Sequence, residues 1–194
     1  QTLTTSGAGA TTITGLQANL TDTSTAAQDI TVASVATITL GLGSDTTDTD
    51  AVDARALTNG QILTLTGAND ATISFDEGDI TASAYTGGLT VTGTGTAGQF
   101  TTGTASSSIS STGTTAIVAT ALADGQTLTT TGNGALTITG LQANLAVNDA
   151  RSAAHSVTAA AVANLTVAMG TSTSDTDTIV ATALTDGQVL TLTG

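Results

Sequence analysis

The chain lacks cysteine, proline, tryptophan and lysine, and each absence removes a class of structure. Without cysteine it can form no disulfide, thiolate nucleophile or thiolate metal site. Without proline, every backbone N–H after the first is free to join a hydrogen-bonded ladder. Only Phe75, Phe100 and Tyr85 are aromatic, so a core must be built mainly from Ala, Val, Ile and Leu. Such small and β-branched side chains favour thin, closely stacked sheets.

Positive charge is almost absent as well. Arg55 and Arg151 are the only permanent cations against fifteen acids, which gives a formal net charge of -13. Binding to nucleic acid or to an anionic membrane surface needs Lys and Arg, so both are excluded. No apolar run is long enough to span a bilayer, and we expect no membrane insertion. His155, the only histidine, lacks a catalytic context, so we expect no enzyme and no catalytic or cofactor-binding residue.

One phrase, Q-x-L-T-x-x-G, recurs along the chain. Its glutamine falls at Gln1, Gln61, Gln126 and Gln188, so successive copies are 60, 65 and 62 residues apart. A fixed period of this kind indicates a solenoid or a tandem array. The chain therefore holds three periods and part of a fourth, and we expect it to belong to a longer array. The predicted units are 1–60, 61–125, 126–187 and the beginning of a fourth repeat at 188–194.

Within each repeat, Leu, Ile or Val alternates with Thr, which is the pattern of short, half-buried strands. We predict an all-β parallel β-helix (β-solenoid) with about three stacked coils per 60–65-residue repeat. The alternative is a row of tandem antiparallel β-sandwiches, in which Asn59-Gly60 and Asp124-Gly125 would be hairpin turns. A sandwich of 60–65 residues would have a small core without aromatic filling or disulfides, which favours the solenoid.

Four segments carry a resemblance to a known group of proteins: VDARALTNGQILTLTG (52–67), ITASAYTGGLTVTG (80–93), IVATALADGQTLTTTG (117–132) and IVATALTDGQVLTLTG (179–194). They resemble the Thr/Ala/Gly-rich β-strand repeats of large bacterial cell-surface proteins of the S-layer and RTX-type adhesin kind. The resemblance implies a secreted, β-rich, structural or adhesive protein, in a group that is often Ca²⁺-dependent. The Ca²⁺-binding nonapeptide of RTX coils does not occur here, so no site is carried over through that motif.

From these features we predict an extracellular structural protein at the bacterial cell surface, within a self-assembling fibre, an S-layer-like coat or an adhesin stalk. Its expected partner is itself, either as a filament or sheet of copies or as covalent continuation into further repeats. One alternative is a binding module for ice or glycan on such a stalk, because T-x-T rows resemble ice-binding arrays. A more remote alternative is a β-helical polysaccharide-acting enzyme, which the scarcity of cations disfavours.

The acidic residues concentrate in the run SDTTDTDAVD and in its counterpart SDTDT. Hard oxygen ligands on a Gly-flanked turn suit Ca²⁺. The alternation also places two of these acids on one strand face, where a cation would relieve their repulsion. We interpret six residues as candidate calcium ligands: Asp45, Asp48, Asp50, Asp53, Asp175 and Asp177. The alternative for them is a solvated acidic loop that favours solubility.

Two further polar sets have structural interpretations. Asp76, Glu77 and Asp79 form an acidic turn, which we interpret as solvated and not as a general acid/base pair. Asn19 and Asn144 occupy equivalent repeat positions, with Asp79 at the third. We expect these three to satisfy backbone groups of neighbouring coils.

Overall fold

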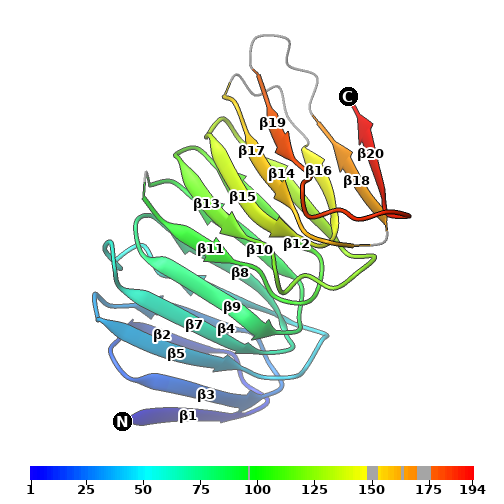
Figure 1. The fold of residues 1–194 in the computed structure, drawn as a ribbon. Coiled ribbons are helices and arrows are strands. Elements are labelled where there is room, and N and C mark those ends of the chain that lie inside the picture. The colour runs from blue at the N-terminus through cyan, green and yellow to red at the C-terminus, as the bar shows by residue number, and fades with distance from the viewer. Residues whose placement is uncertain (96, 148–152, 163, 170–175) are drawn as a thin grey trace.

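The chain forms two parallel β-sheets in the computed structural model, which describes residues 1–95, 97–147, 153–162, 164–169 and 176–194 (Figure 1). Consecutive strands alternate between the sheets, so each coil contributes one strand to each. The first and last coils lie at opposite ends of the stack (Figure 1). The predicted β-solenoid is confirmed. No helix long and apolar enough to cross a membrane occurs in the described residues.

Over the described residues, each sheet contains ten strands, in sequence order from one end to the other. The odd-numbered sheet holds β1 (Thr2–Gly7), β3 (Asn19–Ser24), β5 (Thr37–Leu42), β7 (Ile62–Gly67), β9 (Asp79–Tyr85), β11 (Gln99–Thr101), β13 (Thr115–Val118), β15 (Leu136–Leu141), β17 (Ser156–Ala159) and β19 (Thr178–Val180). The even-numbered sheet holds β2 (Thr11–Leu16), β4 (Gln28–Val32), β6 (Thr49–Asp53), β8 (Asp70–Phe75), β10 (Leu89–Gly93), β12 (Ser107–Ser111), β14 (Thr127–Thr131), β16 (Asn144–Val147), β18 (Asn164–Ala168) and β20 (Val189–Thr193).

Alternation along each strand divides it into an inner and an outer face. In β7, Leu63 and Leu65 are fully buried, whereas Thr64 and Thr66 are only partly buried on the other face. Successive side chains of a strand point to opposite faces, so the apolar half turns inward. The threonines then cover the outer surface, where their β-branched side chains suit a strand.

The inward side chains form continuous rows along the stack, because the strand register is kept from coil to coil. One row in the odd-numbered sheet runs through Ile38, Leu63, Ile80, Phe100, Ile117, Ile138, Val157 and Ile179. A row in the even-numbered sheet runs through Ile30, Val52, Ile73, Val91, Ile109, Thr130 and Val147. The buried apolar residues form a single cluster, so the repeats share one core.

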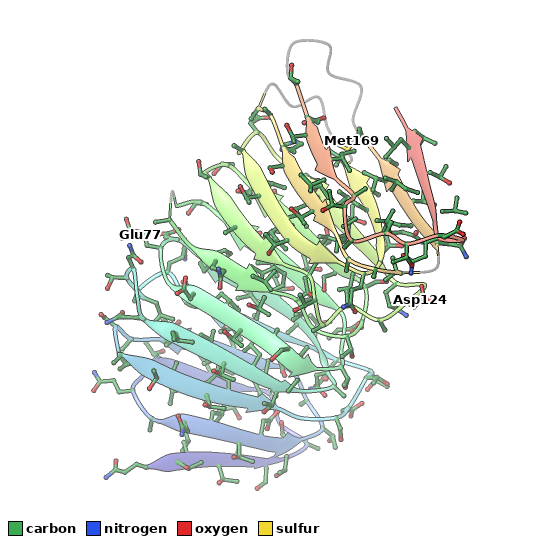
Figure 2. The ribbon with its side chains drawn as sticks, viewed as in Figure 1. Glu77, Asp124 and Met169 are labelled. Atoms are coloured by element: carbon green, nitrogen blue, oxygen red, sulfur yellow. The ribbon has the colours of Figure 1, made fainter. Side chains whose placement is uncertain are left out.

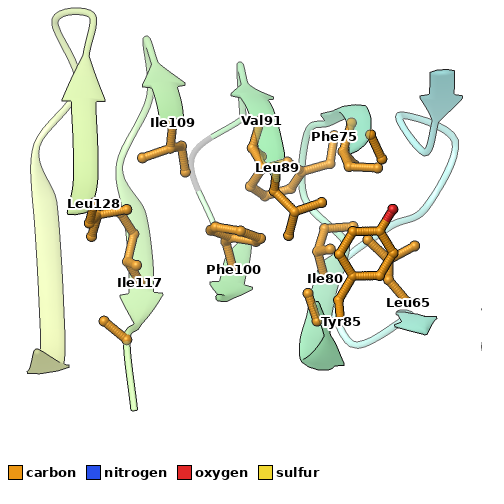
Figure 3. Close-up of a cluster of buried hydrophobic side chains, with 14 of the residues drawn as sticks. Leu65, Phe75, Ile80, Tyr85, Leu89, Val91, Phe100, Ile109, Ile117 and Leu128 are labelled. Carbon is orange, nitrogen blue, oxygen red and sulfur yellow. The ribbon is translucent and has the colours of Figure 1, made fainter. Parts of the chain in front are cut away.

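The three aromatic side chains gather in the middle repeat. Phe75 of β8, Tyr85 of β9 and Phe100 of β11 are at most 1 % exposed and pack among aliphatic residues that include Leu65 and Ile80 (Figure 3). The core side chains are therefore largest in the middle repeat, whereas the core of the coils on either side is aliphatic.

The antiparallel alternative is wrong, because every strand pairing in the described residues is parallel. Asn59-Gly60 joins β6 of one sheet to β7 of the other. Gln61 N–H donates to the Thr58 carbonyl across this turn, and Gly60 has a φ of 82°. Asn59 has no positive φ, which makes the turn type II and not the type I′ turn of a tight hairpin.

The middle repeat is one strand longer than predicted. Repeat 1 contains β1–β6 and repeat 3 contains β14–β19, which is three coils each, but repeat 2 contains β7–β13. Because repeat 2 has an odd number of strands, the first strand of repeat 3 lies in the opposite sheet from the first strand of repeat 2. The Q-x-L-T phrase therefore opens β1 and β7 in one sheet but β14 and β20 in the other.

Candidate functional site

The densest set of buried polar side chains lies at one corner of the first coils, where the chain passes from the odd-numbered to the even-numbered sheet. Its members come from three successive coils: β3–β4, β5–β6 and β7–β8. Each member lies either at an inward-facing position of its strand or in the turn beside that strand. Its side chain directs a polar group toward the core. We call this set the acid corner: the buried Asp22, Gln28, Asp50 and Asn69, together with the half-buried Asp48.

Asp50 is the centre of the acid corner and is fully buried. Its Oδ1 accepts a hydrogen bond of 2.8 Å from the backbone N–H of Gln28. Its Oδ2 accepts one of 3.2 Å from Nδ2 of Asn69. The same Nδ2 donates to Oδ1 of Asp48 at 3.1 Å, so a single amide joins the two carboxylates.

Asp22 contributes a third carboxylate from the preceding coil. It is 5 % exposed, and its Oδ1 accepts hydrogen bonds from the hydroxyl of Thr5 at 2.6 Å and from the backbone N–H of Ser24 at 2.9 Å. Nε2 of Gln28 donates to Oγ of Ser24 at 2.7 Å. These bonds hold Asp22 and Gln28 in place beside Asp50.

Four oxygen atoms in the acid corner are buried without a hydrogen-bond partner: Oδ2 of Asp22, Oε1 of Gln28, Oδ2 of Asp48 and Oδ1 of Asn69. All four are acceptors. A buried polar group without a partner costs free energy, about 1–3 kcal/mol for a neutral group and more for a charged one. The acid corner is therefore short of positive or hydrogen-bond-donating groups.

The one arginine among the described residues does not supply them. Arg55, the only arginine in the described residues, donates to Asp53 through Nε at 2.9 Å and forms an ion pair of 2.6 Å with it. The pKa of Asp50 is raised by burial, only partly offset by the hydrogen bonds from Gln28 and Asn69, and raised further by Asp48 and Asp22. The pKa of Asp48 is raised by burial and by the charges of Asp45 and Asp22.

Tyr85 of β9 covers the acid corner from the coil that follows β7 and β8. Its hydroxyl is buried and donates to the backbone carbonyl of Asn69. Burial raises the pKa of Tyr85, and the charges of Asp50, Asp70 and Asp48 raise it further. The phenol therefore stays neutral and acts as a hydrogen-bond donor, which fixes the backbone of Asn69.

A hollow of about 610 Å³ opens beside the acid corner. Its lining comes from β3, β5 and β7 and the turns that follow, and it includes Asp22, Ser24, Gly43 and Asp45. Gly43 has no side chain to obstruct the amide of Asn69; a Cβ there would lie 3.4 Å from its Oδ1. The hollow thus borders Asp22 of the acid corner and Gly43, which lies next to the Asn69 amide.

The structure brings together only part of the predicted calcium set. Asp48 and Asp50 share the amide of Asn69, and Asp45 lies in the turn before them, where it accepts hydrogen bonds from Thr47. Asp53 is on the outer side of β6 and is bound by Arg55. Asp177 lies at another corner, and Asp175 lies outside the described residues.

The described residues contain no group of three or more His, Cys, Asp or Glu side chains that could hold a metal ion by themselves. Any cation at the acid corner must therefore take amide or backbone oxygens, or water, as additional ligands. Sequence reasoning missed Asp22, Gln28 and Asn69 as members. Period-two alternation in NLTDTS, which places Asp22 on the same face as Leu20, was a usable signal for the first of them.

Asp177 occupies the position equivalent to Asp50 in the third repeat. Its Oδ1 accepts a hydrogen bond of 2.8 Å from the backbone N–H of His155, as Asp50 does from Gln28. The neighbour equivalent to Asp22 is Val147, which is 8 % exposed. The carboxylate position thus has a structural role in both repeats, and only the first repeat surrounds it with further described acids.

The remaining polar predictions concern the strand ends and turns. Oδ1 of Asn19, Asn144 and Asp79 each accepts a backbone N–H from the adjacent coil, from Thr39, Thr166 and Gln99 respectively. That role is confirmed. In the acidic turn, Asp76 accepts a hydrogen bond from Thr94, and Glu77 is exposed at the edge of the stack, as is Asp124 (Figure 2).

No family model, curated protein or solved structure matches this chain.

Proposed function

We propose that the chain is a segment of an extracellular structural protein, whose stacked coils form a stiff spacer in a surface fibre, coat or adhesin stalk. One observation carries the proposal: the same phrase is buried inside the stack and exposed in its end coils. Leu65 of β7 is fully buried, whereas the equivalent Leu192 of β20 is 55 % exposed. Leu3 of β1, equivalent to the fully buried Leu63, is 40 % exposed.

Exposed apolar side chains on an open sheet edge are a template for further strands. Among the described residues, the large hydrophobic side chains that are exposed lie only in β1, β19 and β20: Leu3, Val180, Val189 and Leu192. Leu3 and Leu192 face inward, in register with the buried Leu20 and Val167, whereas Val180 and Val189 lie on the outer face. A further coil of the same kind would cover each end and continue the ladders. Stability in such an array is a sum of unit and neighbour terms, so each added coil strengthens its neighbours.

A tandem chain in which residues 1–187 are followed directly by 1–194 tests the proposal. This join keeps the Q-x-L-T register, because residues 188–194 and 1–7 carry the same phrase. We expect one rod of about twice the length by small-angle scattering and a higher Tm than the single chain, since one pair of open ends becomes buried. The control inserts a flexible Gly/Ser linker of about 20 residues at the join. Equal Tm values for the two tandem chains would contradict the proposal.

Negative-stain microscopy and light scattering of the unmodified chain test self-association. We expect concentration-dependent filaments or end-to-end oligomers, which Leu192→Lys disrupts because it places a charge on the open inner face. Thr191→Lys on the outer face of the same strand is the matched control and should associate normally. Monodisperse single particles at high concentration would argue against association of separate copies.

A second candidate, a binding module, is favoured by a hydroxyl array on the outer face of the even-numbered sheet. Four adjacent strands each present two hydroxyls in register: Thr72 and Ser74, Thr90 and Thr92, Ser108 and Ser110, Thr129 and Thr131. The array repeats about every 4.8 Å between strands and about 6.7 Å along them. Such regular spacing suits an ordered water or sugar lattice.

Thermal hysteresis and ice-crystal shape measure ice binding directly. We expect Thr90→Tyr, in the centre of the array, to abolish any activity, and Thr21→Tyr on the opposite sheet to preserve it. Absence of hysteresis in the unmodified protein would remove ice from consideration and leave the structural function.

A further inference from the structure

We propose that the acid corner is a binding site for one divalent cation of the Ca²⁺ type, which links three successive coils. The inference stands independently of the proposed structural function. It rests on the geometry of Asp22, Gln28, Asp48, Asp50 and Asn69, and none of these residues lies on the open ends of the stack.

Acidic residues alone do not make a cation site, and the decisive observation concerns Asn69. This side chain is fully buried and reaches into the pair of carboxylates, because its Nδ2 donates to both Asp48 and Asp50. Its Oδ1 nevertheless has no partner. Gln28, 1 % exposed, likewise donates through Nε2 while its Oε1 has none. Two buried amides of the acid corner thus carry carbonyl oxygens that have no hydrogen-bond partner.

The number of unpartnered oxygens distinguishes a cation from a proton. A proton shared by Asp48 and Asp50 would neutralise one charge, but it supplies a single donor. Four acceptor oxygens lack partners. A cation is bound by several oxygens at once, and Ca²⁺ takes about 6–8 of them from carboxylates, amide or backbone carbonyls and water. The acid corner has the ligand types that Ca²⁺ prefers and none of the nitrogen or sulfur ligands of zinc.

The charge of the acid corner points the same way. Asp50 is fully buried and Asp22 is 5 % exposed, so both carboxylates have lost much of their hydration. An isolated buried charge is costly unless it is paired or coordinates a metal. The cation must enter from solvent, and the hollow lined by Asp22, Gly43 and Asp45 provides the route. Asp45 at its rim would attract a cation toward the interior.

A cation there would connect elements that are far apart in sequence. Asp22 and Gln28 belong to the coil of β3 and β4, Asp48 and Asp50 to that of β5 and β6, and Asn69 to the next. Binding would tie the three coils at the corner where they change sheet. Anything that binds the folded state alone stabilises it, so the first repeat would depend on the cation concentration.

Tyr85 makes the proposal directly testable. It is the only tyrosine, the chain has no tryptophan, and its hydroxyl donates to the Asn69 carbonyl. Tb³⁺ takes the same oxygen ligands as Ca²⁺ and luminesces when a nearby tyrosine transfers energy to it. We expect Tb³⁺ added to the folded chain to give tyrosine-sensitised emission that saturates at one ion and is displaced by Ca²⁺. Tyr85→Phe should remove the emission while Ca²⁺ binding measured by calorimetry persists.

Matched variants assign the site. Asp50→Asn and Asp48→Asn should each weaken Tb³⁺ and Ca²⁺ binding about 10–100-fold, the range seen when the support of a metal site is lost. Asp177→Asn removes the equivalent carboxylate of the third repeat, where Val147 replaces Asp22, and should bind like the wild type. After Asp50→Asn or Asp177→Asn, the amide oxygen can still accept the backbone N–H of Gln28 or His155. After Asp48→Asn, it can still accept from Nδ2 of Asn69, so folding is preserved.

Thermal melts of the wild type complete the test, because they need no variant. Ca²⁺ should raise Tm relative to EDTA, and Mg²⁺ should raise it less, since it demands a stricter octahedral site. An unchanged wild-type Tm together with no saturable sensitised emission overturns the proposal. Equal weakening by Asp50→Asn and Asp177→Asn also overturns it, because binding would then reflect overall negative charge.

Discussion

Leu65 and Leu192 occupy the same position in the same phrase, yet one is fully buried and the other is 55 % exposed. The difference comes from neighbours: β7 pairs with β5 and β9, whereas β20 pairs with β18 alone. In a globular domain, burial is decided within the unit. Here the phrase specifies which side chain turns inward, and the adjacent coil decides whether that side chain leaves water.

The largest expected difference in stability is between alanine substitutions at two equivalent glycines of that phrase. Gly67 has a φ of 127°, and a Cβ there would lie 1.6 Å from the Leu42 carbonyl oxygen. Gly7 has a φ of 105°, with nothing within 4 Å of its Cβ position. Left-handed strain costs roughly 1–2 kcal/mol at either site. Gly67→Ala adds a backbone clash of about 1–3 kcal/mol or more, because neither strand can move without breaking the ladder.

Chemical denaturation of the two glycine variants measures this difference. We expect Gly7→Ala to lose roughly the strain term alone, about 1–2 kcal/mol. Gly67→Ala should lose at least twice as much, or fail to fold. Equal losses for both variants would show that the coils yield at this contact, and that the close approach of β7 and β5 does not constrain the stack.

The next effect compares the two leucines. Leu65→Ala leaves a cavity between the sheets and should cost about 2–5 kcal/mol. Leu192→Ala removes a side chain that already faces solvent and should cost less than about 1 kcal/mol in the isolated chain. In the tandem chain with a direct join, Leu3 of the second copy lies at the covered position equivalent to Leu63, and Leu3→Ala there should approach the cost of Leu65→Ala. Denaturant midpoints of the single and tandem chains provide the measurement.

Local patterns predicted the strands and their inward faces, because both depend on neighbours in sequence. ILTLTG and LTITGL alternate apolar and polar residues, and each forms a strand with the expected side buried. Asp22 follows the same alternation, but it was not among the predicted site residues. The turn at Asn59-Gly60 was harder to predict, since the same dipeptide suits a tight hairpin equally well. The negative φ of Asn59, which a sequence does not reveal, excludes the type I′ hairpin turn.

Contacts between coils were beyond local patterns. Asn69 joins Asp48 and Asp50 from about twenty residues away, at a distance fixed by the length of the coil. Nothing in its own surroundings, Ala68 and Asp70, marks it as a partner of those acids. The extra strand of repeat 2 was missed for a similar reason, because a period of 65 residues accommodates six or seven strands equally well.

A smaller expected effect is the pH dependence of stability, which we compare between variants at Asp50 and at Asp177. Burial raises the pKa of Asp50 and Asp48 above 3.8, so the folded state binds protons more tightly than the unfolded state. Their contribution to stability is therefore fully present below 3.8 and is lost as pH rises through the raised pKa values. In EDTA, we expect the wild-type Tm to rise on acidification from pH 7 toward this range.

Variants separate this rise from the general relief of negative charge. Asp50→Asn should flatten the rise, because one of the two titrating groups is gone, and Asp177→Asn should keep it. Saturating Ca²⁺ should also flatten it in the wild type, since the cation replaces the proton and leaves as pH falls. A rise of the same size in all three proteins would assign it to overall charge instead of the acid corner.

The smallest effect concerns Asp53, three residues from Asp50 on the same strand. The hydrogen bonds from Arg55 hold the pKa of Asp53 below 3.8, the opposite direction from Asp50. Its contribution is thus present above 3.8 and lost as pH falls below it. The Arg55 side chain is 58 % exposed, so Asp53→Asn should cost only about 0–1 kcal/mol and leave Ca²⁺ binding unchanged. A larger loss of Ca²⁺ affinity than for Asp50→Asn would move the cation to the outer face of β6, beside Arg55, and away from the interior carboxylates.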